Sequence, residues 1–131
     1  MIKLLLALFL TTISTNAMAK WVLNISTTNG EEKIYFDDAT IKINGDLVKI
    51  WELWDYEIPN ILSVGSYKSS VDRREYNCKN ETSRIIQSTA YEGRMQTGEI
   101  IHTLKTTKFE EIMPNTPLSM MFKSVCRAVK K

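Results

Sequence analysis

Two cysteines, Cys78 and Cys126, restrict the folds open to this 131-residue chain more than any other feature. The first nineteen residues have the pattern of a secretory signal: Lys3 precedes an apolar run over residues 4–10, and residues 17–19 form a small-x-small cleavage site. Export leads to an oxidising compartment, where two cysteines pair more often than they stay free. If they pair within one chain, the bond stabilises the fold by roughly 4 kcal/mol in the chain-entropy model.

Length and charge limit the class of protein further. At 15.1 kDa the chain is long enough for one domain with a core and too short for two, so we expect a signal peptide over residues 1–19 and one domain over 20–131. Removing the signal takes away only Lys3, which leaves 16 Lys and Arg against 15 Asp and Glu, a net charge of +1. This balance argues against a nucleic-acid partner. No later segment approaches about 20 consecutive apolar residues, so we expect no membrane span.

Most of the domain has the pattern of short strands separated by turns. The Asn44-Gly45 dipeptide is the strongest hairpin signal, because both residues accept positive φ cheaply. The segment 47–56 is apolar on both faces, which is typical of a strand in the middle of a sheet that is covered on both sides. Pro59 and Asn60 are expected to open a loop. The expected strands cover residues 21–28, 33–36, 40–43, 47–56, 66–78, 83–91 and 99–104.

The C-terminal segment has a helical pattern instead. Thr116 can cap a helix, and Pro117 suits its first turn because the missing N–H would be unpaired there. Apolar residues then recur on one stripe at positions 118, 121, 122, 125, 126 and 129. The predicted fold is therefore α+β: a single antiparallel sheet of about six strands, with one C-terminal helix packed on one face and tethered by a disulfide between Cys78 and Cys126.

One helix can cover only one face of such a sheet. On the segment 47–56, Trp54 and Tyr56 point to one face, whereas Trp51 points to the other. The face without the helix needs another cover, which long loops, sheet curvature or a second copy of the protein would supply. We therefore predict a homodimer.

The polar residues do not form a recognisable catalytic, metal or cofactor site. His102 is the single histidine, so a histidine-rich metal site is impossible; it is expected to be an ordinary strand residue, and a haem-ligand role is the alternative. The paired carboxylates at 31–32, 37–38 and 110–111 are interpreted as solvated turn residues, with Asp37 and Asp38 capping the turn before Thr40. We expect no enzyme activity and no cofactor.

Candidate partner-binding residues come from two kinds of pattern. Arg73 and Arg74, flanked by acids, form either a basic patch for a partner or an exposed face of paired charges. Aromatic residues of segment 47–56 form either core or a binding platform. The candidate partner surface comprises Trp51, Trp54, Tyr56, Arg73, Arg74, Arg94 and Met95.

Taken in order, the chain resembles the bacterial surface-adhesin protein E family. The matching elements are Trp21-Val22, Tyr35-Phe36-Asp37, residues 48–56, Tyr67-Lys68-Ser69, Cys78, Arg84, residues 88–91, Gly98, residues 112–116 and Cys126. The resemblance implies a sheet of about six strands with a disulfide-held C-terminal helix, and an exported protein of a Gram-negative bacterium. For the founding adhesins it implies a surface role in binding host matrix and serum proteins. The family has no catalytic motif to carry over.

A lipoprotein adhesin needs a cysteine at its signal cleavage site, and the first cysteine here is Cys78. We therefore expect neither a lipid anchor nor a membrane span, and a location in the periplasm first, secreted or at the cell surface second. The leading hypothesis is a non-enzymatic exported protein that binds a host or envelope protein. Its likeliest contacts are the loops over residues 59–66 and 92–98. The alternative is a soluble periplasmic carrier of an apolar ligand such as haem, using the uncovered aromatic face with His102 or Met95.

Overall fold

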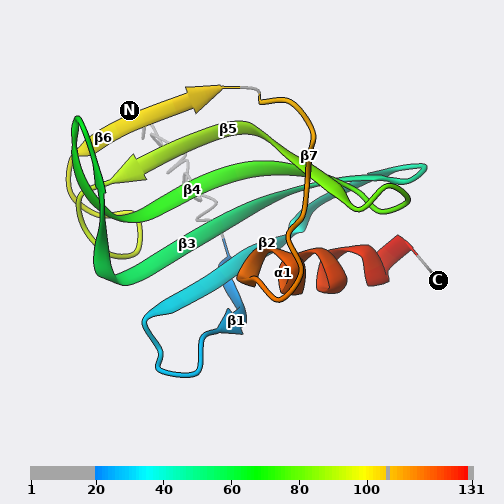
Figure 1. The fold of residues 1–131 in the computed structure, drawn as a ribbon, viewed down its shortest axis with the longest axis horizontal. Coiled ribbons are helices and arrows are strands. Elements are labelled where there is room, and N and C mark those ends of the chain that lie inside the picture. Colours follow the sequence, from blue (N-terminus) through cyan, green and yellow to red (C-terminus); the bar gives the residue numbers. More distant parts are fainter. Residues whose placement is uncertain (1–19, 106, 130–131) are drawn as a thin grey trace, which may run out of the picture.

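The computed structural model describes residues 20–105 and 107–129, so the predicted signal peptide lies outside the described residues. One antiparallel sheet with strand order β1-β2-β3-β4-β5-β6 carries a single α-helix, α1, on one face (Figure 1). The short β7 pairs with the start of β5. This confirms the predicted fold class. The elements are β1 (Val22–Ser26), β2 (Glu32–Asn44), β3 (Leu47–Leu62), β4 (Gly65–Asn77), β5 (Thr82–Tyr91), β6 (Ile100–Lys105), β7 (Glu110–Glu111) and α1 (Pro117–Cys126), followed by a 3-10 turn, Arg127–Val129.

The second and third predicted strands are one continuous strand, β2. Its register against β3 shifts between Asp37 and Lys42. Within the shift, the Asp37 carboxylate accepts a hydrogen bond from the Ala39 amide, and the Thr40 hydroxyl donates to the Asp37 carbonyl. These local bonds satisfy backbone groups that leave the ladder, so the chain bulges rather than turns. The predicted turn before Thr40 is therefore an irregularity within a strand, and Asp37 is buried rather than solvated.

Strand β3 continues beyond the predicted loop at Pro59 and reaches Leu62. Its pairing with β4 is interrupted between Asp55 and Asn60, and Pro59 lies in this interruption, where its missing N–H costs no ladder bond. The β3–β4 hairpin therefore projects further than the sequence suggests. Its tip curls toward β6, and a Cβ placed on Gly65 would lie 3.2 Å from the Ile101 side chain. Figure 1 shows the tip beside the start of β6, at the opposite end of the sheet from α1.

The core lies between the sheet and α1. Ile34, Val48, Ile50 and Tyr76 are fully or almost fully buried on the sheet, and Met121 is fully buried on the helix. The Thr116 hydroxyl accepts from the Ser119 amide, and the Ser119 hydroxyl accepts from the Thr116 amide, so a capping box starts α1 as predicted.

A disulfide between Cys78 and Cys126 joins the β4–β5 turn to the last residue of α1. The predicted apolar stripe is confirmed, because Met121, Val125 and Cys126 are buried against the sheet. No helix in the described part of the chain has the length and apolar character that a membrane crossing requires.

The sheet face opposite α1 receives part of its cover from the β5–β6 loop, residues 92–99. Asp55 and Ser69 point to this face, and both bind the loop. Leu53 on the same face is fully buried, whereas Trp51 is half-buried. A loop was one of the three covers predicted for this face, and the β5–β6 loop supplies part of it. The homodimer stays a prediction.

Candidate functional site

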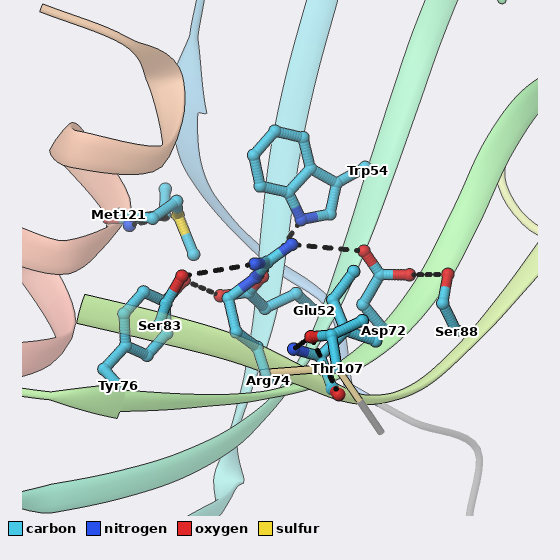
Figure 2. A network of polar contacts seen from close by, with 11 residues as sticks. Glu52, Trp54, Asp72, Arg74, Tyr76, Ser83, Ser88, Thr107 and Met121 are labelled. Carbon is cyan, nitrogen blue, oxygen red and sulfur yellow. Dashed lines mark hydrogen bonds and ion pairs between the residues drawn. The ribbon is translucent and has the colours of Figure 1, made fainter. Parts of the chain in front are cut away.

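A buried polar network crosses the middle of the sheet on the helix side, centred on Glu52 of β3 (Figure 2). Glu52 Oε1 accepts from Trp54 Nε1 at 3.0 Å and from Arg74 Nε at 3.1 Å. Glu52 Oε2 accepts from the Tyr76 hydroxyl. The carboxylate is fully buried, so these three donors replace its hydration.

Asp72 of β4 lies directly across from Glu52 in the register, and Arg74 serves both carboxylates. Arg74 Nη2 lies 3.7 Å from Asp72 Oδ2, and its guanidinium is 5.7 Å from the centre of the Trp54 ring. The Ser88 hydroxyl donates to Asp72 Oδ1 at 2.5 Å. The two buried carboxylates, Glu52 and Asp72, therefore share one buried cation, Arg74. Burial raises the pKa of Asp72 to about 6, because the Ser88 hydrogen bond and the Arg74 charge offset desolvation only in part.

This raised pKa predicts a pH-dependent stability. Folded Asp72 binds its proton below about pH 6, whereas an unfolded aspartate does so only below about pH 4, so the folded state gains stability as the pH falls between these values. From pH 7.5 to pH 5 the gain from this group is about 1 kcal/mol. Urea unfolding at both pH values should show this gain in the wild type and its loss in Asp72→Asn. Asp46→Asn, at an exposed site, is the control and should keep the pH dependence of the wild type. The same pH dependence in Asp72→Asn as in the wild type would contradict the prediction.

No sequence pattern predicts this network. The sequence predicts a partner patch or an exposed face at Arg73 and Arg74, but Arg74 is buried and paired with acids on its own strand and on β3. The available signal was Glu52, a charge between Ile50 and Trp54 on the same face of an apolar strand. Neither of the two cavities described below is lined by Glu52, Asp72 or Arg74, so the network acts as a structural core.

A second polar cluster fixes the β5–β6 loop to the face opposite α1. Asp55 Oδ2 accepts from Arg94 Nε at 3.0 Å and Nη2 at 2.6 Å, and Asp55 Oδ1 accepts from the Met95 amide at 2.8 Å. The Ser69 hydroxyl donates to the Gly93 carbonyl at 2.6 Å and accepts from the Gln96 amide at 2.9 Å. The buried groups of β3 and β4 thereby set the conformation of an otherwise exposed loop.

This fixed loop and the β3–β4 hairpin lie together at one end of the molecule. Residues of both segments line a shallow depression of about 500 Å³, among them Pro59, Ser66 and Arg94. Four apolar side chains of the hairpin are exposed, with Ile61 85% and Val64 61% accessible. Arg94 and Met95 are exposed at the loop. We call this set the hairpin-end surface: Ile58, Ile61, Leu62, Val64, Arg94 and Met95.

The structure divides the predicted partner residues among several environments. Trp54 and Arg74 are buried on the helix face, so neither is available to a partner in this fold. Tyr56 is half-buried on that face and packs edge-to-face on Tyr67, with the ring centres 5.9 Å apart. Trp51 and Arg73 are half-buried cross-strand neighbours on the other face.

Of the seven predicted residues, only Arg94 and Met95 lie at the hairpin-end surface. The two loops named from the sequence, residues 59–66 and 92–98, are brought together there. Ile61 and Val64 lie within the first of these predicted contact segments, but Pro59 predicts a loop where the structure has the end of strand β3.

The haem-carrier alternative gains no support from the geometry. His102 is exposed on β6, Met95 is exposed on the loop, and neither lines one of the two cavities. Within residues 20–105 and 107–129, no three His, Cys, Asp or Glu side chains are grouped closely enough to hold a metal ion.

The fold defines a class of small domain in which a disulfide ties one C-terminal helix to a six-stranded antiparallel sheet. Residues 21–127 match the model of the family described as surface-adhesin protein E, and the chain belongs to this family. No curated protein sequence gives a significant match.

Solved structures of Haemophilus influenzae protein E share the fold. Crystal form II is 14% identical, with a TM-score of 0.62 over 89% of this chain and 94% of that one. The selenomethionine form is 16% identical, with a TM-score of 0.58 over 86% and 90%. Protein E from a non-typeable strain is 16% identical, with a TM-score of 0.55 over 86% and 79%.

Proposed function

We propose that this protein is a non-enzymatic exported binding protein of the adhesin type, and that it contacts a protein partner through the hairpin-end surface. The observation that carries the proposal is the exposure of four apolar side chains on a hairpin beside a loop that is held in place by hydrogen bonds to the buried Asp55. Membership of the adhesin family supports a non-enzymatic exported surface protein.

The physical reason is the cost of leaving this surface in water. Burial of an Ile or Val side chain contributes about 1.5–3 kcal/mol, so Ile61 and Val64 alone can supply much of the energy of a protein contact. The neighbouring loop is already ordered by Asp55 and Ser69, so a partner would not have to order it. Exposed apolar patches rimmed by polar residues are typical of protein-binding surfaces.

The test is binding of the mature domain to a panel of purified matrix and serum proteins, measured by surface plasmon resonance. For a partner that binds the wild type, the double variant Ile61→Ser/Val64→Ser should bind about 10–100-fold more weakly, because both side chains lose apolar contact area. Its stability should stay close to that of the wild type, since both side chains are exposed.

The matched control is Met113→Ser, which removes an apolar side chain, 72% exposed, from the segment before α1. This variant should bind as the wild type does. Equal binding by the hairpin variant and the wild type would place the contact elsewhere and refute the proposed surface.

The location is expected to be the periplasm first and the cell surface or medium second. Antibody labelling and protease shaving of intact cells separate these locations, and protein that is inaccessible on intact cells would exclude the surface role.

A second copy of the chain is the other occupant to test at the hairpin end. Light scattering should show a dimer if the homodimer prediction holds. Ile61→Ser/Val64→Ser should return the mass to that of a monomer if the second copy binds at the hairpin end, and should leave it dimeric if the second copy covers the sheet face opposite α1.

A further inference from the structure

A second hollow lies at the opposite end of the molecule, beside the disulfide. It has a volume of about 430 Å³, within the range of small-molecule sites in proteins. One wall is a stripe of α1 that includes Phe122, Lys123 and Cys126. The other walls come from the β4–β5 turn, including Glu81, and from the segment that precedes α1, including Ile112. Figure 1 shows α1 and the β4–β5 turn at the end away from the β3–β4 hairpin.

The walls of this hollow are held in place without a ligand. The disulfide joins the β4–β5 turn to α1, and the Ile112 amide donates to the Glu81 carbonyl at 3.3 Å. Asn115 has a φ of +59°, and the capping box at Thr116 then starts the helix. A preformed hollow of this kind requires little ordering when it binds a small molecule.

The chemistry of the lining is amphipathic. Ile112, Phe122 and the disulfide supply an apolar surface. Two cations four residues apart line the hollow, Lys123 on α1 and Arg127 directly after the end of α1, and Glu81 is the one acidic residue among the lining residues. In the described part of the chain, neither cationic side chain takes part in an ion pair. The lining side chains therefore carry a net charge of +1, and both of the cationic side chains can pair with an anionic ligand.

We propose that this hollow binds a small amphipathic anion, a monocarboxylate with an apolar body. The apolar body packs against Phe122 and the disulfide, and the carboxylate accepts hydrogen bonds from Lys123 and Arg127. Glu81 opposes the anion from the facing turn. This site is separate from the hairpin-end surface and does not depend on the proposed protein binding.

The probe is decanoate, titrated into the mature domain by calorimetry and by amide chemical-shift mapping. Saturable binding is expected, with shifts confined to residues 78–81 and 112–127. Lys123→Gln/Arg127→Gln should weaken binding about tenfold, because two exposed ion pairs are lost. Glu81→Gln should strengthen it about twofold, because a repulsive charge is removed. Lys108→Gln removes an exposed cation from outside the hollow and should leave the affinity unchanged.

Two ligands of the same chain length test the role of charge. Decanol should bind more weakly than decanoate, and decyltrimethylammonium more weakly still. The proposal is overturned if decanoate fails to bind, if its affinity is unchanged in Lys123→Gln/Arg127→Gln, or if decyltrimethylammonium binds as tightly. Repeating the titration with phenylacetate distinguishes a site for fatty acids from a site for aromatic acids. Phenylacetate should bind more tightly than decanoate only if the site is selective for an aromatic body.

Discussion

Glu52→Ala is expected to lower the free energy of unfolding by about 3–5 kcal/mol, because it leaves Arg74 buried without its closest anion. The variant also deprives the Trp54 indole and the Tyr76 hydroxyl of their acceptor. Buried donors without partners add to the cost of the unpaired charge. Urea unfolding at neutral pH measures the loss, and Glu57→Ala, at an exposed site on the same strand, should change stability by less than about 0.5 kcal/mol.

A double variant separates the cost of an unpaired charge from the worth of the pair. Glu52→Leu alone should destabilise strongly, whereas Glu52→Leu/Arg74→Leu should be less destabilised than Glu52→Leu, since it removes both charges from the core. A double variant that is less stable than the single variant would show that the network stabilises the fold by its own net energy. That result would contradict the interpretation of the loss as an unpaired-charge effect.

The sheet and the helix were predictable because their signals are local. The two-sided apolar pattern of residues 47–56 identified the central strand, Asn44-Gly45 identified the hairpin, and the apolar stripe after Thr116 identified α1. The bulge at Asp37 was missed because residues such as Asp37 and Thr40, whose side chains bond to nearby backbone groups, are also typical of turns. Local patterns thus gave the type of each element more reliably than its ends.

The buried network and the hairpin-end surface were less predictable because they depend on register. The pairing of Glu52 with Arg74 requires the alignment of β3 and β4, which the intervening hairpin sets and no local pattern reveals. The same holds for Asp55 and Arg94, which are 39 residues apart in sequence. The burial of Trp54 follows from these contacts, so its aromatic character alone could not distinguish core from surface.

Removal of the disulfide is the second change with a large expected effect. Cys78 and Cys126 are 48 residues apart, and opening a loop of that length should lower the free energy of unfolding by about 4 kcal/mol in the chain-entropy model. The double variant Cys78→Ser/Cys126→Ser tests this by urea unfolding. The bond also holds the end of α1, so amides of residues 121–126 should exchange faster with solvent than in the wild type, while amides of β3 and β4 should exchange as the whole domain unfolds.

The reduced wild type is the matched control, because it lacks the same covalent link and keeps both sulfur atoms. Its stability should equal that of Cys78→Ser/Cys126→Ser within about 1 kcal/mol, since Cys126 is buried and a small polar replacement adds only a modest cost. A loss below about 1 kcal/mol in both proteins would mean that Met121 and Val125 dock α1 without help. The disulfide would then be dispensable for the fold.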